Sequence, residues 1–298
     1  MVNFCYTGRM LGGSKVKTGF LIVLAYFNLL AWAVIFDLSQ NGLEIVFFDV
    51  GQGDSIFIET PSKHQILIDG GPDFSVLEKL GQNMAFYDRT IDLVILTHPD
   101  HDHLAGLLDV LNNYQVENIL WTGVVKETTE FDEWKRLIQE EGARIVIAEA
   151  GKKIVCLGGN DLTEMAVLHP SERLTGQTMK DINNSSIVIQ LSFGEVKALL
   201  TGDISSSVEK SLIEKGIFLK ADVLKIAHHG SKNSTSEDFL KEVSPQLAVI
   251  SVGADNSYGH PNSVVLELLS KYGIKILRTD QDGDIRIFSG GQDFKIIN

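Results

Sequence analysis

The feature that most constrains this chain is an apolar strand that leads into a cluster of metal-capable side chains. The run "IDLVIL" (91–96) is typical of a strand at the centre of a sheet that is covered on both faces. It is followed at once by "THPDHDHLAGL" (97–107), in which three histidines and two aspartates occupy positions 98–103. Capping of the next helix explains Asp102. The histidines are left unexplained unless the strand ends in a metal site.

Beyond residue 43 the chain alternates short β-rich runs with helical segments. Apolar residues in helical spacing follow several of these runs, as in "HLAGLLDVLNNY" (103–114) and "NSVVLELLSKYG" (262–273). The segment "SSIVIQLSFGEVKALLTGD" (185–203) predicts a hairpin that turns at 193–195. The pattern therefore predicts one α/β domain over residues 43–298, with a polar loop at 171–184 inside it.

Side chains of metal-ligand type recur where the predicted strands end. They are Asp49, Asp69, His98 to His103, His169, Asp203, His228 and His229. Ligands bind at strand ends in layered α/β folds, so we expect these residues to meet at one edge. Of the adjacent pair His228 and His229, one is expected to be a metal ligand and the other to face the substrate or support the ligands.

The spacing within the histidine-rich loop indicates two neighbouring metal ions. His98 and Asp100 are two residues apart, so in an extended loop they can point to the same side. Asp102 and His103 open the next helix and form a second pair. A carboxylate at Asp203 could bridge the two ions. Metal–ligand bonds of ~2 Å and a metal pair ~4 Å apart then require Asp203 to lie within about 10 Å of His98.

The N-terminal residues 1–37 predict a membrane anchor. Residues 19–36 are 18 residues without a charge, which is near the lower limit for spanning a bilayer. Arg9, Lys15 and Lys17 precede them, so we expect a single-pass helix with its N-terminus in the cytoplasm and the domain outside. The alternative is a cleaved signal peptide and a secreted domain, with "AWA" (31–33) as a weak cleavage site.

The charge balance restricts the partners of the chain. The net charge is −13, and residues 1–36 carry three cations and no acid, so residues 37–298 carry −16. An acidic body excludes a broad nucleic-acid-binding surface, although a bound metal and a few lysines could still hold a nucleic acid. Cys5 and Cys156 provide neither a disulfide framework nor a cysteine-based zinc site.

These motifs together resemble the metallo-β-lactamase superfamily. H-x-D-x-D-H at 98–103 resembles the superfamily's H-x-H-x-D-H motif, with Asp100 in place of the middle histidine, and "LTGD", ending at Asp203, resembles its bridging-aspartate motif. A closer resemblance is to the metallo-β-lactamase-like domain at the C-terminus of ComEC-type DNA-uptake (competence) proteins. The matching segments, in order from Val46 onward, are "FFDVGQGDSIFIETP", "ILIDGG", "THPDHDHLAGL", "VLHP", "NNSSIVIQL", "LLTGD", "VLKIAHHGSKNSTS", "VISVGADNSYGHP" and "TDQDGDIRI".

The resemblance implies a four-layer αββα sandwich over residues 43–298 and a metal-dependent hydrolase. We expect a phosphodiesterase or nuclease related to DNA uptake, in which two divalent ions, Zn²⁺ or Mn²⁺, activate a hydroxide between them. Asp100 offers a carboxylate oxygen, which is a harder ligand than a histidine nitrogen and brings Mn²⁺ into consideration beside Zn²⁺. The channel-forming region of ComEC proteins has no counterpart here, so the expected partners are a phosphodiester such as DNA and a separate DNA-uptake channel protein.

The site residues follow from the motifs and from the resemblance. The predicted metal ligands are His98, Asp100, Asp102, His103, Asp203, His228 and His229. The predicted catalytic residues are Asp102, Asp203, His228 and His260. Residues that could ligate a metal or support the ligands are Asp69, His169 and Asn184, the last lying where the superfamily usually has a histidine. By resemblance, Asp49, Gln52 and Asp54 lie on the same rim, whereas His101 is expected to point away from it.

Two other functions are compatible with the same residues. One is hydrolysis of another envelope phosphodiester, as by a teichoic-acid-type esterase, because an esterase branch of the superfamily has a similar site. The other is a non-catalytic metal-binding module, which the large number of candidate ligands disfavours. A β-lactamase is disfavoured because Asp100 replaces the middle histidine.

Overall fold

The chain divides into two units, Met1–Asn41 and Gly42–Asn298. The computed structural model describes residues 13–39, 42–158 and 161–297, so Cys5 and Arg9 lie outside the described residues. The apolar segment 19–36 is helical and belongs to α1 (Gly13–Ser39). Among the described residues, however, no helix combines the length and the apolar character that crossing a bilayer requires, so the predicted transmembrane helix is not supported.

The second unit is built on two mixed β-sheets. The first sheet has the strand order β15 (Phe294–Ile297), β14 (Ile285–Ser289), β1 (Leu43–Phe47), β2 (Ile56–Glu59), β3 (Gln65–Ile68), β4 (Thr90–Leu96), β5 (Gln115–Trp121) and β6 (Arg144–Ile147). The second has the order β13 (Lys275–Arg278), β12 (Leu247–Ile250), β11 (Val223–Lys225), β10 (Val196–Leu200), β9 (Val188–Phe193), β8 (Asp161–His169) and β7 (Lys153–Gly158). Strands β3 to β6 are mutually parallel, and so are β10 to β13.

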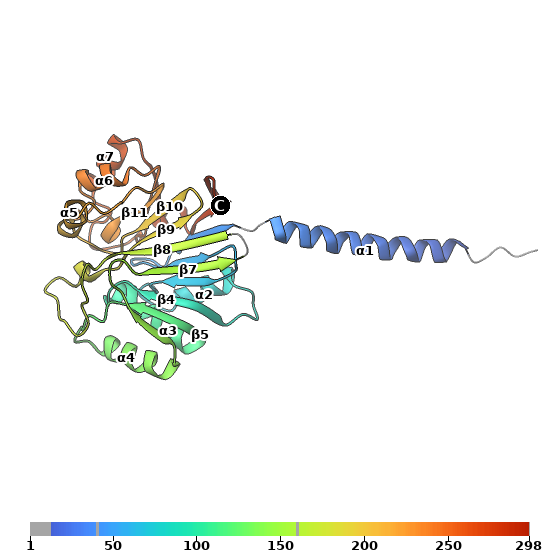
Figure 1. Cartoon of the computed structure of the whole chain (residues 1–298), viewed down its shortest axis with the longest axis horizontal. Coiled ribbons are helices and arrows are strands. Elements are labelled where there is room, and N and C mark those ends of the chain that lie inside the picture. Colours follow the sequence, from blue (N-terminus) through green and yellow to red (C-terminus); the bar gives the residue numbers. More distant parts are fainter. Residues whose placement is uncertain (1–12, 40–41, 159–160, 298) are drawn as a thin grey trace, which may run out of the picture. The chain divides into compact units, whose positions relative to one another are not determined.

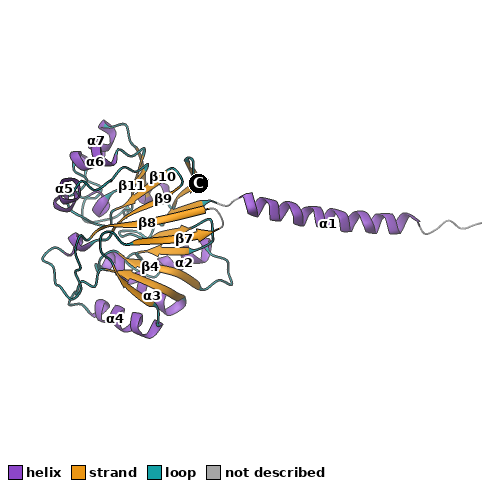
Figure 2. Cartoon of the chain, viewed as in Figure 1, coloured by secondary structure: helices purple, strands orange, loops and turns teal. Residues whose placement is uncertain are grey.

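Helices cover the outer face of each sheet, as Figures 1 and 2 show for this unit. The first sheet is covered by α2 (Ser75–Asn83), α3 (His101–Asn113) and α4 (Thr129–Glu141), which share one apolar core with it. The second is covered by α5 (Ser206–Glu214), α6 (Glu237–Val243) and α7 (Ser263–Lys271) in the same way. A third apolar core fills the space between the sheets. The predicted four-layer αββα sandwich is confirmed.

Strand β4 shows why its sequence is apolar without alternation. Leu93 and Ile95 face the core between the sheets, while Val94 and Leu96 face the core under the helices. Because successive side chains of a strand point to opposite faces, the stretch 93–96, which is buried on both faces, is apolar at every position, whereas Asp92 before it is only partly buried. The strand lies between β3 and β5, inside the first sheet, as predicted.

The other elements agree with the sequence in type, with a few additions. The predicted hairpin is formed by β9 and β10, which turn between Phe193 and Val196. The polar stretch 171–184 is a loop that ends in the short 3₁₀ helix η1 (Ile182–Ser185). Four elements were not predicted: the strand β5, the 3₁₀ helices η1 and η2 (Ala227–Gly230), and the short helix α8 (Thr279–Asp282). The loops at the carboxyl ends of β3, β4, β10, β11 and β12 carry most of the predicted site residues.

Candidate metal centre

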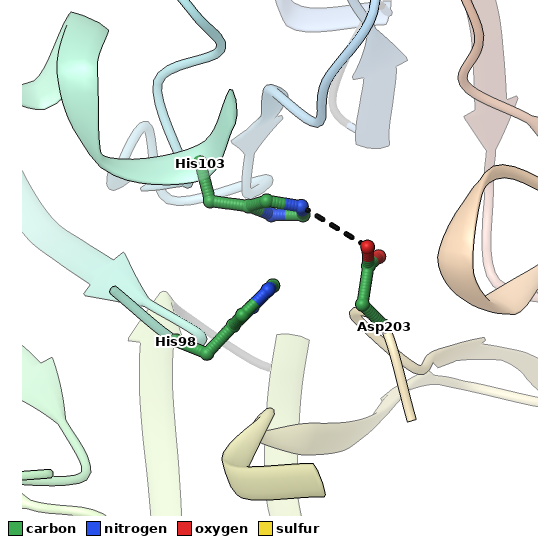
Figure 3. Close-up of side chains that lie close together, drawn as sticks. All are labelled: His98, His103 and Asp203. Atoms are coloured by element: carbon green, nitrogen blue, oxygen red, sulfur yellow. Dashed lines mark ion pairs between the residues drawn. The ribbon is translucent and has the colours of Figure 1, made fainter. Parts of the chain in front are cut away.

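The first group of candidate ligands comes from both sheets. His98 follows β4, His103 lies in the first turn of α3, and Asp203 follows β10. All three are buried, and their ligand atoms lie within 4.8 Å of one another. Figure 3 shows the two rings and the carboxylate pointing toward one another, with His103 Nε2 3.4 Å from Asp203 Oδ2. The separation of His98 and Asp203 is therefore well within the limit that a shared metal pair imposes.

A second group overlaps the first. Asp102, His103 and His229 also place ligand atoms within 4.8 Å of one another. His229 Nε2 is 3.2 Å from Asp102 Oδ2 and 3.3 Å from Asp203 Oδ2. His103 thus belongs to both groups, and Asp203 of the first group contacts His229 of the second, which is compatible with two neighbouring ions.

The supporting hydrogen bonds leave one nitrogen of each ring facing the centre. His103 Nδ1 donates to Asp69 Oδ2 over 2.7 Å, and His229 Nδ1 donates to the carbonyl oxygen of Ser251 over 2.8 Å. His98 Nδ1 lies 3.0 Å from the hydroxyl of Thr97. Because Nδ1 is engaged, Nε2 is the atom available to a metal.

The backbone of η2 holds its two histidines in an unusual conformation. His228 (φ 50°, ψ 49°) and His229 (φ 52°, ψ 24°) both adopt the left-handed region, which costs a residue with a side chain roughly 1–3 kcal/mol. This backbone separates the two rings. His229 faces the carboxylates, whereas His228 Nε2 accepts a hydrogen bond from Asn183 Nδ2 over 3.3 Å. The structure therefore places His229, and not His228, in the candidate ligand groups of its described residues.

The loop before β2 packs directly on the ligand-bearing turn. Gly53 has φ +153°, and a Cβ atom there would lie 2.3 Å from the carbonyl oxygen of Asp102. Its neighbour Asp54 donates its backbone N–H to that same oxygen over 3.2 Å. Glycine is therefore required at position 53, and the packing brings the carboxylate of Asp54 into the buried centre.

The electrostatics of the centre are those of a cation site. Burial, with the nearby His103, lowers the pKa of His98 well below its usual range, so this imidazole is neutral. Burial alone would lower the pKa values of His103 and His229, but Asp203 and other nearby carboxylates outweigh burial and raise both. The strong negative potential that raises these pKa values would also attract divalent cations.

One residue of the centre was missed by the sequence reasoning. Lys225, at the end of β11, is fully buried, and its ammonium pairs with Asp54 and lies 3.5 Å from Asp203 Oδ1. Despite burial, these two carboxylates raise its pKa. The available signal was a lysine in the apolar run "VLKIA", where an unpaired charge would be costly.

A small cavity of about 120 Å³ opens onto the centre. It is lined by Gln52, Asp100, Asp102, Asn183, Asp203, His228, His229, Tyr258 and His260. The His260 ring lies 5.7 Å from the His228 ring and stacks on Tyr258 at 5.9 Å. A larger cavity of about 540 Å³, between β5 and β7, is lined by none of the predicted site residues, so we assign the chemistry to the small one.

Asp100 lies at the edge of the centre. One of its carboxylate oxygens pairs with Lys126, and the other is 3.8 Å from His98 Nε2. It belongs to none of the candidate ligand groups among the described residues, although it lines the cavity.

Several other predicted residues lie outside the candidate groups that the described residues form. His169 Nε2 donates to the carbonyl oxygen of Asn184 over 3.0 Å, and the Asn184 side chain accepts hydrogen bonds from Ser205. Asn183, rather than Asn184, lines the cavity. His101 is exposed and pairs with Glu130 at 2.8 Å, so it points away from the centre. The Asp49 carboxylate accepts the backbone N–H of Gly51 over 3.3 Å.

The donor set fits divalent metal ions. Nε2 of His98 and of His103 is buried and has no hydrogen-bond partner among the described residues. A buried polar atom without a partner is costly unless a ligand satisfies it. Imidazole nitrogens combined with carboxylate oxygens suit Zn²⁺ and Mn²⁺. Asp69, which orients His103, supports the ligands instead of facing the cavity.

Comparisons with known proteins agree with this geometry. The chain is 34% identical over 267 residues to ComE operon protein 3 of Bacillus subtilis, covering 84% of this chain and 33% of that protein. It is 32% identical over 253 residues to competence protein ComA of Neisseria gonorrhoeae, with the same coverage. It is 28% identical over 285 residues to recombination protein 2 of Haemophilus influenzae, covering 91% and 32%. The chain thus spans about a third of the length of these relatives. Residues 48–254 match the family model described as the metallo-beta-lactamase superfamily, and the chain belongs to that superfamily.

Proposed function

We propose that this chain is a metal-dependent phosphodiesterase that cleaves DNA during its uptake. The observation that carries the proposal is the pair of overlapping ligand groups, which share His103 and include imidazole nitrogens that have no hydrogen-bond partner among the described residues. Two metals held side by side suit the displacement of a group at phosphorus, since they can bind both the attacking and the leaving oxygen.

The residues divide into those that hold metals and those that face substrate. His98 and Asp203 would hold one ion, and Asp102, His103 and His229 the other; Asp203 Oδ2 also lies 3.3 Å from His229 Nε2. Bound there, the metals lower the pKa of water and offset the negative charge of the phosphate.

His228 and His260 line the cavity beside these ligands and would bind phosphate oxygens. Burial lowers the pKa of His260, and the nearby His228 adds to this effect, so His260 is neutral near pH 7. A neutral imidazole can donate a hydrogen bond to a phosphate oxygen from one ring nitrogen. We therefore assign His260 to orienting the substrate.

The acidity of the chain makes metal ions necessary for such a substrate. Residues 37–298 carry a net charge of −16, which repels a phosphodiester unless cations are bound at the site. The names of the relatives refer to competence and recombination, which supports DNA as the substrate. The chain spans about a third of the length of those relatives, and the proposal names a DNA-uptake channel protein as its partner.

The test is hydrolysis by the purified full-length chain. Single-stranded DNA and bis(p-nitrophenyl) phosphate are incubated with Mn²⁺ or Zn²⁺, with EDTA as the metal-free control. Metal-dependent cleavage of both substrates is the expected result. Cleavage of the generic phosphodiester but not of DNA would favour another envelope phosphodiester, and metal binding without any cleavage would favour the non-catalytic module.

The location of the domain stays a prediction. We propose that it acts outside the cytoplasm, on the basis of the charges that precede residue 19. Protease added to intact cells should digest the domain while a cytosolic marker survives. Digestion only after lysis would contradict this topology.

A further inference from the structure

Lys225 occupies a position at which a lysine must have a specific partner. It ends β11, its side chain is 0% exposed, and it lies inside the metal centre. Its ammonium pairs with Asp54, lies 3.5 Å from Asp203 Oδ1 and donates to the carbonyl oxygen of Gly202 over 3.2 Å. All three donors of the ammonium therefore face an oxygen atom.

The two carboxylate oxygens of Asp203 have different neighbours because of this contact. Oδ1 faces Lys225, whereas Oδ2 faces His103 Nε2 at 3.4 Å and His229 Nε2 at 3.3 Å. The terminal torsion of an aspartate has a broad minimum, so the carboxylate plane is not fixed by its own rotamer. Contact of Oδ1 with a buried ammonium limits that rotation and keeps Oδ2 directed at the imidazoles.

The same ammonium covers Asp54. Two further groups of metal-capable side chains include this residue: Asp54 with Asp203 and His229, and Asp54 with Asp69 and His103. In both, Oδ2 of Asp54 is already paired with Lys225, and the adjacent ammonium repels a cation from Oδ1, which has no hydrogen-bond partner among the described residues. The groups without Asp54 are the ones that contain His98 or Asp102, and Asp102 lines the cavity.

We propose that Lys225 is a positioning residue, a resident cation that orients Asp203 as a metal ligand and keeps metal ions away from Asp54. The proposal rests on the proposed function in one respect, namely that Asp203 holds metal. Lys225 also alters the charge of the loaded site. Four carboxylates (Asp54, Asp69, Asp102 and Asp203) and one ammonium have a formal charge of −3, and two divalent ions bring it to +1. Without Lys225 the loaded site would be neutral and less attractive to an anionic phosphodiester.

The decisive variant removes the lysine without changing the charge of the site. Lys225→Met alone leaves Asp54 Oδ2 and Asp203 Oδ1 buried without the ammonium that they face, so we expect it to unfold at a lower temperature. The double variant Lys225→Met/Asp54→Asn removes one positive and one negative charge together. It should recover much of that stability, because the methionine and asparagine are similar in size to the side chains they replace and carry no charge. Any change in its metal affinity then reports on the orientation of Asp203 and not on net charge.

The measurement is Mn²⁺ binding to the full-length chain by titration calorimetry, with thermal unfolding in EDTA as the folding control. We expect the double variant to fold and to bind Mn²⁺ at least about tenfold more weakly than wild type, the effect typical of losing a residue that orients a ligand. Wild-type affinity in the double variant would overturn the proposal, because Lys225 would then serve only to neutralise Asp54. Failure of the double variant to fold would also overturn it, because the lysine would then be needed for the fold itself. Because the readout is metal binding, a wild type that binds Mn²⁺ but cleaves nothing would remove the proposed function and leave this result valid.

Discussion

Replacing Asp69 by asparagine should weaken metal binding, because it should move the proton of His103 to the nitrogen that faces the metal centre. The Asp69 carboxylate is 1% exposed and accepts three hydrogen bonds. Its Oδ1 accepts the Thr97 backbone N–H over 2.8 Å, and its Oδ2 accepts both the Thr97 hydroxyl and His103 Nδ1, each over 2.7 Å. An amide has a single acceptor atom. If that atom stays with the Thr97 N–H, the amide NH₂ faces His103 Nδ1, which must then become an acceptor.

The magnitude follows from where the proton of His103 goes. A neutral ring that accepts at Nδ1 carries its proton on Nε2, the atom that faces Asp203 at 3.4 Å. A protonated Nε2 has no lone pair for a metal ion. Loss of such a supporting carboxylate costs about 10–100-fold in metal affinity. That factor corresponds to about 1.4–2.8 kcal/mol of binding free energy.

The assay is titration of the full-length chain with Mn²⁺, comparing wild type with Asp69→Asn. Asp132→Asn is the matched control, since the Asp132 side chain is 72% exposed and lies in α4 outside the centre. Thermal unfolding in EDTA shows whether each variant is folded. Unchanged Mn²⁺ affinity in a folded Asp69→Asn variant would refute the reasoning, because it would mean that Asp69 does not determine which nitrogen of His103 carries the proton.

Three further predictions concern other parts of the site. Asp203→Asn should lower phosphodiester turnover roughly a thousandfold and reduce the metal bound per chain. Replacement of the exposed His101 by alanine should change both quantities little. Wild-type turnover and metal content in Asp203→Asn would rule out Asp203 as a metal ligand. Tyr258, which is 71% exposed and lines the cavity, should stack on a nucleobase, so Tyr258→Leu should raise KM for single-stranded DNA but not for an abasic oligonucleotide. Burial lowers the pKa of His169, so the unfolded chain binds its proton more readily and stability falls as pH drops below about 6.5. Urea unfolding at about pH 7.5 and 5.5 should show a smaller loss for His169→Gln than for wild type, and equal losses would count against this assignment.

The layers of the fold and the main ligand loop could be predicted because their signals are local. The apolar run of β4 is continuous because both of its faces are buried, and the ligand loop follows it directly in sequence. Which of two adjacent residues enters the site could not be predicted in the same way. His229 faces the carboxylates and His228 does not because η2 adopts left-handed backbone angles. Asn183 lines the cavity, whereas the side chain of Asn184 accepts hydrogen bonds from Ser205.

Lys225 was missed for a different reason. A lysine at a strand end usually reaches solvent, and nothing near it in sequence indicates otherwise. Its burial depends on Asp54, which arrives from the loop before β2 on the other sheet. Only the packing of the two sheets brings these residues together, so the pair is a tertiary feature without a local sequence signal.

The division of the ligands between the two sheets has a consequence for how the unit holds together. His98 and His103 belong to the half built on the first sheet, while Asp203 and His229 belong to the half built on the second. Metal ions at the centre would therefore link the two halves. Binding free energy is then also stabilisation of the folded state, about 2.7 kcal/mol when the free metal concentration is 100 times its Kd. Removal of the metal ions by a chelator should break this link. Amide hydrogens along the edge where the ligands meet should then exchange faster, while those in the middle of β4 remain protected.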